Sequence, residues 1–125
     1  MVRPKILIVE DDKSLVKILE EALDKEKFEV ILTMDASQAI KKARLEKPNI
    51  IILDVMLPGK SGFTCLQQLK NSKETKNIPA IILSNLGQAE EIKKGLELGA
   101  VDYLVKANFS IDEIIKKILK YLKKN

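Results

Sequence analysis

The chain has 125 residues, which is the usual size of one folded domain. Hydrophobic residues make up 46% and charged residues 32% of it, and this balance excludes an intrinsically disordered protein. The net charge is only +4, so we expect no direct binding to nucleic acid. A group of lysines near the C-terminus predicts a solvated helix face, with a contact surface for an acidic partner or nucleic acid as the alternative. These lysines are Lys116, Lys117, Lys120, Lys123 and Lys124.

The cysteine content and the hydropathy of the chain indicate in which compartment of the cell we expect the protein. Cys65 is the single cysteine and the chain has no histidine, which excludes an internal disulfide and a histidine-activated thiol. We therefore interpret Cys65 as a packed thiol and expect a reducing, cytoplasmic location. No apolar run approaches the roughly 18 residues of a membrane-spanning helix and no signal-peptide pattern is present, so we expect no membrane association.

The first half of the chain alternates short apolar runs with segments whose apolar residues recur at helical spacing. A strand is predicted over 5–9 and is followed by a helix across 15–23. A second strand over 29–33 leads to a helix over 36–43, which closes before Pro48. Polar residues flank this second strand, so we expect it at an edge of the sheet.

The second half of the chain repeats the alternation. Predicted strands cover 50–53, 80–83 and 102–105, and predicted helices cover 63–71, 89–96 and 111–122. Gly99 can end the second of these helices in a left-handed conformation. Ser110 and Glu113 have the spacing of a capping box at the start of the last one.

Five strands and five helices in strict alternation predict one α/β domain, a doubly wound parallel sheet with helices on both faces. The runs at 6–9, 50–53 and 80–83 are apolar without alternation, as strands buried on both faces should be. The carboxyl ends of such strands share one edge of the sheet, where open α/β sheets bind ligands. Polar side chains follow four of the five strands there. They are Glu10, Asp11, Asp12, Asp54, Ser84 and Lys106.

The acids in this group predict metal and phosphate chemistry. Glu10, Asp11 and Asp54 would repel one another unless a cation were present. Oxygen ligands without histidine or cysteine select a hard ion such as Mg2+ or Mn2+. A carboxylate beside such an ion can attack phosphorus and become an aspartyl phosphate, whose oxygens Ser84 and Lys106 could bind. Taken singly, an acid after a strand is most often a helix cap, so the prediction depends on the combination.

The segments that carry these residues resemble the receiver domain of two-component response regulators, the CheY-like family. The matching segments are ILIVEDD at 6–12, ILDVMLPG at 52–59, ILS at 82–84 and GAVDYLVK at 99–106. The resemblance extends over 1–125 and implies a flavodoxin-like sheet with strand order 2-1-3-4-5. It also implies a signalling switch, and not an enzyme that turns over a substrate.

The resemblance implies roles for the acidic residues. Asp54 would accept a phosphoryl group from a sensor histidine kinase or a phosphotransfer protein. Asp11, Asp54 and the backbone carbonyl of Met56 would bind Mg2+ or Mn2+. Glu10 would act through a metal-bound water.

The resemblance also implies a switch and an output surface. Ser84 and Lys106 would bind the phosphoryl oxygens, and Tyr103 would turn inward when Ser84 moves toward the phosphate. The surface built from the fourth helix, fifth strand and fifth helix, with Lys93 and Lys94, would contact a downstream partner. The domain would be a monomer or a phosphorylation-dependent dimer. The alternative for Tyr103 is a half-buried strand tyrosine without a switch role.

The sequence departs from the family pattern at a few positions. Ala107 replaces the usual proline after Lys106, which often follows a cis bond in the family. A cis bond before a non-proline residue costs roughly 3 kcal/mol, so the sequence leaves both a cis and a trans bond open here. Asn85 stands where a small residue is common, and the loop 58–62 carries Lys60 and Ser61 where a hydrophobic–acid pair is frequent.

Three alternatives remain open at the level of sequence. The chain could be a receiver excised from a longer transcription factor, although no helix-turn-helix pattern follows it and this favours a stand-alone domain. It could be a phosphatase with an aspartyl-phosphate intermediate, but Met56 stands where such enzymes need a second acid. It could also be an unphosphorylated interaction module, which the complete set of site residues disfavours.

Overall fold

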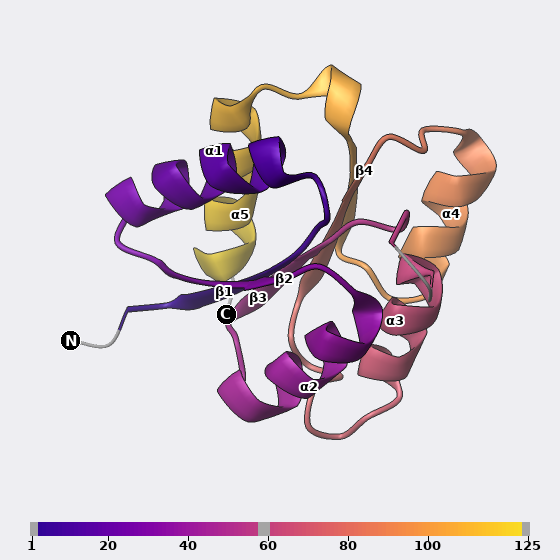
Figure 1. Cartoon of the computed structure of the whole chain (residues 1–125). Coiled ribbons are helices and arrows are strands. Elements are labelled where there is room, and N and C mark those ends of the chain that lie inside the picture. The colour runs from indigo at the N-terminus through magenta and orange to yellow at the C-terminus, as the bar shows by residue number, and fades with distance from the viewer. Residues whose placement is uncertain (1–2, 58–60, 124–125) are drawn as a thin grey trace.

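The structure is a computed structural model that describes residues 3–123 except 58–60, so Pro58, Gly59 and Lys60 of the predicted loop lie outside the described residues. All ten predicted elements are present within it (Figure 1). The strands are β1 Lys5–Val9, β2 Glu29–Thr33, β3 Ile50–Leu53, β4 Ala80–Ser84 and β5 Asp102–Val105. The helices are α1 Lys13–Lys25, α2 Ala36–Glu46, α3 Gly62–Lys70, α4 Ala89–Glu97 and α5 Ile111–Lys123.

The five strands form one parallel sheet in the order β2-β1-β3-β4-β5, as predicted. β1, β3 and β4 are the inner strands, and nearly all their residues are buried, which explains their continuous apolar sequence. β2 is an edge strand with a partly exposed pattern, which confirms the expectation from its polar flanks. The fold is therefore the doubly wound α/β architecture that the alternation predicts.

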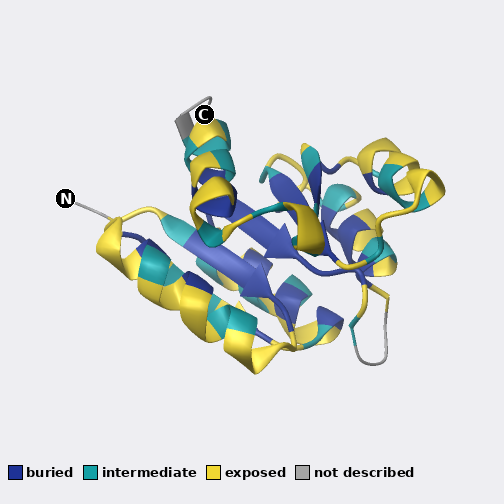
Figure 2. Ribbon diagram, turned by 90° about the horizontal axis from the view of Figure 1, so that it is seen from above, coloured by how far each residue is buried: buried dark blue, intermediate teal, exposed yellow. Residues whose placement is uncertain are grey.

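Helices cover both faces of the sheet (Figure 1). α1 and α5 lie on one face, and α2, α3 and α4 lie on the other. Side chains of β1 alternate between the two cores: Ile6 and Ile8 pack under α1 and α5, whereas Leu7 and Val9 pack on the other face. Figure 2 shows the resulting layers, with buried strands in the middle and exposed helix surfaces outside.

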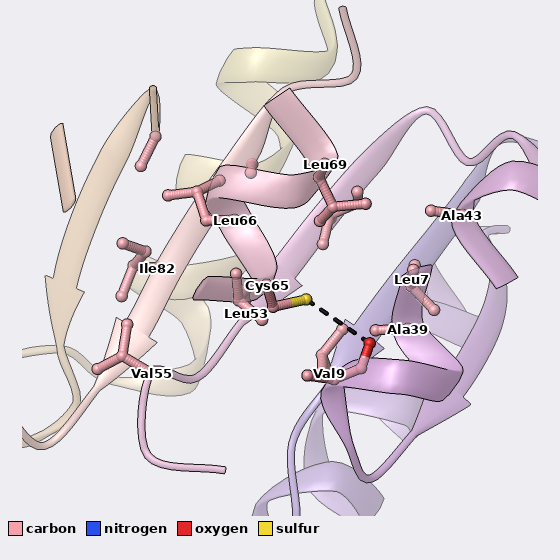
Figure 3. Close-up of a cluster of buried hydrophobic side chains, with 14 of the residues drawn as sticks. Leu7, Val9, Ala39, Ala43, Leu53, Val55, Cys65, Leu66, Leu69 and Ile82 are labelled. Atoms are coloured by element: carbon pink, nitrogen blue, oxygen red, sulfur yellow. Dashed lines mark hydrogen bonds between the residues drawn. The ribbon is translucent and has the colours of Figure 1, made fainter. Parts of the chain in front are cut away.

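Cys65 lies within the core that the second face shares with α2 and α3. Its side chain is fully buried, and its Sγ lies 3.8 Å from the backbone carbonyl oxygen of Ala36 (Figure 3). Leu66 and Leu69 of the same helix pack in this cluster together with Leu53. The structure thus confirms that Cys65 is a packed thiol.

Side-chain caps fix where the helices begin. Asp12 accepts hydrogen bonds from the backbone N–H groups of Ser14 and Leu15 and so caps α1. Ser110 and Glu113 form the predicted capping box, in which each side chain bonds the other residue's backbone N–H. The predicted left-handed glycine after α4 is also present.

One local element was not predicted, a 3-10 turn over Lys106–Asn108 between β5 and α5. The described residues contain no cis peptide bond, so the bond between Lys106 and Ala107, which the sequence left open, is trans. The turn closes when the backbone N–H of Phe109 donates to the carbonyl of Lys106. It leaves the Lys106 side chain at the carboxyl edge of the sheet.

Candidate functional site

Strand register brings the predicted acids together. β1 and β3 pair with Val9 opposite Leu53, so the following residues, Glu10 and Asp54, leave the sheet side by side. Glu10, Asp11 and Asp54 each offer a carboxylate oxygen, and these oxygens all lie within 4.8 Å of one another. Glu10 and Asp54 are buried and Asp11 is exposed. The cluster could therefore hold a metal ion that is approached from the side of Asp11.

Lys106 joins the two buried carboxylates. Its Nζ lies 2.8 Å from Oε1 of Glu10 and 3.0 Å from Oδ2 of Asp54. The Lys106 side chain is only 15% exposed, against 4% for Glu10 and 5% for Asp54, so water screens these ion pairs poorly. The ammonium offsets the repulsion that two adjacent carboxylates would otherwise suffer.

The protonation equilibria follow from this burial. Burial raises the pKa of the Glu10 carboxyl, and the hydrogen bond from Lys106 only partly opposes the rise. Burial alone would lower the pKa of the Lys106 ammonium, but its hydrogen bonds to Glu10 and Asp54 outweigh this and leave the pKa above its ordinary value. Lys106 is therefore a permanent cation of the site at neutral pH.

Backbone N–H groups hold the second oxygen of each buried acid. Oε2 of Glu10 accepts hydrogen bonds from the N–H groups of Asp11 and Asp12, both at 3.1 Å. Oδ1 of Asp54 accepts one from the N–H of Met56 at 2.9 Å. Each carboxylate is thus oriented from two sides, by its own loop and by Lys106.

Gly62, at the start of α3, shapes the loop that follows Asp54, and this role was not predicted from the sequence. Its backbone N–H donates to the carbonyl of Val55 at 3.0 Å. A Cβ at Gly62 would collide with the carbonyl oxygen of Asp54 and with Cα of Val55, which are backbone atoms that cannot turn away. A glycine a few residues beyond an acid that ends a strand was the available signal, but only the fold shows the contact.

Hydrogen bonds to Leu86, in the loop after β4, connect Ser84 at the end of β4 with Tyr103 of β5. Ser84 is fully buried, and its Oγ accepts a hydrogen bond from the N–H of Leu86 at 3.2 Å. The Tyr103 hydroxyl donates to the carbonyl of Leu86 at 2.6 Å, and the side chain is buried at 7% exposure, not half-buried. Burial raises the pKa of the Tyr103 phenol, and a hydrogen bond with Ser84 partly opposes this. The described contacts include none between Ser84 and the carboxylates.

The lysines predicted on the surface differ in their surroundings. Lys94 of α4 places its Nζ 4.7 Å from the ring centre of Phe63 on α3, a cation–π contact between the two helices. Lys117 of α5 pairs with Asp102 at 3.6 Å, while Lys116 and Lys120 are exposed. The side chains of Lys123 and Lys124 lie outside the described residues.

Comparison with known proteins identifies the family of this domain. The family model of the response regulator receiver domain matches residues 6–119, which include every predicted site residue. The chain belongs to the response regulator receiver domain family. Such domains serve response regulators of two-component systems and interact with histidine kinases or phosphotransfer proteins.

The receiver domain is similar to parts of longer regulators. It is 39% identical over 111 residues to the response regulator PleD of Caulobacter vibrioides. The matched stretch covers 89% of this chain and 24% of that protein. It is 37% identical over 121 residues to the transcriptional regulatory protein PhoP of Bacillus subtilis, covering 97% of this chain and 49% of that protein. The chain thus spans about half or less of the length of these relatives.

Solved structures agree with the observed fold. The receiver domain of the Francisella response regulator 1452 superposes with a TM-score of 0.88 at 31% identity, covering 98% of both chains. The BeF3-activated receiver domain of Klebsiella pneumoniae RstA superposes with a TM-score of 0.86 at 29% identity, covering 94% of this chain and 97% of that one. Among the described helices, none has the length and apolar character that crossing a membrane requires.

Proposed function

We propose that this receiver domain accepts a phosphoryl group on Asp54 and thereby changes a surface that a downstream partner recognises. The observation that supports this best is the convergence of Glu10, Asp11 and Asp54 within 4.8 Å, with the Lys106 ammonium bonded to two of them. A buried acid next to a fixed cation at the carboxyl edge of a parallel sheet suits phosphoryl transfer, which depends mainly on positioning and charge neutralisation.

The proposed transfer takes place between a phosphohistidine and Asp54. One carboxylate oxygen of Asp54 forms a bond to phosphorus while the N–P bond of the phosphohistidine breaks. The imidazole nitrogen leaves with the electron pair and takes up a proton from solvent. Lys106 offsets the added negative charge, and Ser84 offers its hydroxyl to a phosphoryl oxygen. The domain accepts one phosphoryl group on its own side chain and releases no product from a bound substrate, so it acts as a switch and not as a turnover enzyme.

The acidic cluster fits a hard divalent ion because its donors are carboxylate oxygens only. We assign Mg2+, with Mn2+ as a substitute, to Asp11, Asp54 and the Met56 carbonyl, and give Glu10 a role through a bound water. When bound, the ion supplies positive charge that complements the phosphoryl oxygens. Residues of this chain then orient the acceptor, since Met56 and Lys106 each hold one oxygen of Asp54.

The proposed change of surface begins at Ser84. If its hydroxyl moves toward the phosphoryl group, the bond from the Leu86 N–H carries the loop after β4 with it. The same loop accepts the hydrogen bond of Tyr103, so the aromatic side chain responds to the loop. The partner surface would be the one formed by α4, β5 and α5, used by a monomer or by a phosphorylation-dependent dimer.

The test is incubation with acetyl phosphate and Mg2+, followed by intact-mass measurement. We expect the mass to rise by one phosphoryl group, and we expect Asp54→Ala to abolish the gain completely. Asp35→Ala is the matched control, because Asp35 is an acid that caps α2 and has no part in the site. An unmodified wild-type chain under these conditions would support an interaction module without phosphorylation instead.

The lifetime of the phosphoryl group is a second prediction. Met56 and Leu86 lie two residues beyond Asp54 and Ser84, at positions that flank the path of hydrolytic water in this family, and both are apolar. We expect slow hydrolysis in Mg2+ buffer and at least about tenfold faster loss in Leu86→Glu, because a carboxylate there can orient water or take its proton. The decay of the phosphorylated mass measures both rates, with Leu86→Met as the apolar control. Equal or slower loss in Leu86→Glu would contradict this explanation.

A further inference from the structure

We propose that Gly95 of α4 is a positioning residue that keeps the Tyr103 ring inward, and that it thereby sets how readily the domain responds to phosphorylation. The second part rests on the proposed function, in which Tyr103 is the switch. The first part rests on geometry alone. Gly95 and Ile82 bound the space that the ring occupies, which we call the ring seat.

The ring seat exists because Gly95 has no side chain. A Cβ at this position would lie 2.9 Å and 3.2 Å from Cδ2 and Cε2 of the Tyr103 ring and 2.6 Å from Cδ1 of Ile82. Contacts below 3.0 Å between carbon atoms are strongly repulsive, so an added methyl group would force a neighbour to move. Glycine inside a helix weakens it relative to alanine, and here the absence of a side chain makes room for an aromatic ring.

Of the groups around the ring seat, we infer that the Tyr103 ring is the one that yields to an added methyl group. Ile82 is fully buried in the inner strand β4, where it pairs with Leu53 on one side and Tyr103 on the other. α4 is held by the N–H of Ala100, which donates to the Gly95 carbonyl at 3.1 Å, and by the contact between Lys94 and Phe63. Tyr103 lies on the edge strand β5, with no further strand beyond it in the sheet, and 7% of its surface is exposed, so outward rotation of its ring displaces less of the core than a shift of Ile82.

Two hydrogen bonds connect the ring seat to the site. The Tyr103 hydroxyl donates to the Leu86 carbonyl at 2.6 Å, and the Leu86 N–H donates to Oγ of Ser84 at 3.2 Å. An inward ring therefore supports one arrangement of the loop that carries Ser84. If phosphoryl binding needs that arrangement, the apparent affinity for the phosphoryl group is proportional to the fraction of molecules whose ring is inward. It falls when that fraction falls.

The position of the ring can be measured directly, because the chain has two tyrosines and no tryptophan. Incorporated 3-fluorotyrosine gives two 19F resonances, which Tyr121→Phe assigns. In Gly95→Ala we expect the Tyr103 resonance to move toward the value of the solvent-exposed amino acid, while the Tyr121 resonance stays. Glu97→Ala is the control, because it places alanine at an exposed position of the same helix.

A second variant keeps the test decisive if Gly95→Ala does not fold. Ile82→Val removes Cδ1, the atom closest to the added methyl, so in the double variant Gly95→Ala, Ile82→Val the Tyr103 ring is the main remaining obstacle. We expect an outward Tyr103 resonance in the double variant and an inward one in Ile82→Val alone. An unchanged Tyr103 resonance in a folded Gly95 variant would overturn the proposal.

Affinity for beryllofluoride in Mg2+ buffer tests the link to Asp54. If the inward fraction falls to about a tenth, we expect about tenfold weaker binding in the Gly95 variant. A ring that moves without any change in this affinity would overturn the regulatory part of the proposal. A wild-type chain that gains no mass from acetyl phosphate would defeat the proposed function instead, and the 19F measurement would still decide whether Gly95 positions the ring.

Discussion

Lys106→Met is expected to slow phosphorylation of Asp54 by acetyl phosphate by about a hundredfold or more, the usual cost of removing a fixed electrostatic donor from a reaction centre. The Lys106 ammonium lies 3.0 Å from Oδ2 of Asp54. It is therefore placed to neutralise the phosphoryl oxygens, which carry the negative charge when the group is transferred to this carboxylate. Methionine keeps the length and the apolar stem of the side chain but removes the charge. Intact-mass time courses at fixed Mg2+ would measure the rate.

The same substitution should lower stability when metal is scarce. Two buried carboxylates would lose their cation, and breaking a buried ion pair from one side costs about 3–5 kcal/mol. Mg2+ should restore part of the unfolding free energy, and its affinity should rise because the cluster of Glu10, Asp11 and Asp54 becomes more negative. Burial raises the pKa of the Glu10 carboxyl, and the substitution removes the Lys106 hydrogen bond that opposes this rise. The folded state therefore binds more protons than the unfolded state, and the loss of unfolding free energy in Lys106→Met should become smaller as the pH falls.

Urea unfolding with and without Mg2+, at several pH values, would measure these effects. Lys117→Met is the matched control, since Lys117 pairs with Asp102 outside the site and is more exposed. It should leave the phosphorylation rate near that of the wild type and change stability by less than about 1 kcal/mol. A Lys106→Met protein that is phosphorylated at the wild-type rate would mean that Lys106 has no electrostatic role in the transfer.

Gly62→Ala is expected to lower the free energy of unfolding by about 3 kcal/mol and to misplace the phosphoacceptor. Overpacking a filled site usually costs about 1–3 kcal/mol, and the upper end applies because the obstacle is backbone. The added methyl would press on the carbonyl of Asp54 and on Val55, which form the loop that orients the Asp54 carboxylate. Urea unfolding gives the stability change, and Mg2+ titration reports the metal site.

Gly87→Ala provides the comparison for this glycine. The three atoms nearest to a Cβ at Gly87 would be side-chain atoms of Val105, the first at 3.0 Å, and these can move slightly. We expect a stability change below about 1 kcal/mol there, as for most substitutions away from tight contacts. Similar losses in the two variants would show that the backbone contact of Gly62 has no special weight.

The fold could be predicted from the chain because its strands are buried on both sides. Continuous apolar runs bounded by polar residues located β1 and β3 to the residue, and alternation with helical spacing implied a parallel sheet. Parallel strands end at a common edge, so the acids after β1 and β3 could be placed together from the sequence alone. That inference needed only local patterns and a general rule of α/β topology.

Tertiary packing decided what those patterns do not encode. Lys106 bonds to Asp54 across 52 residues of sequence, and nothing local to either residue specifies that its ammonium also reaches Glu10. The inward ring of Tyr103 depends on the missing side chain of Gly95 on a neighbouring helix. These features arise from close contact between atoms of separate elements, and hydropathy and spacing carry no information about the shape of the space between them.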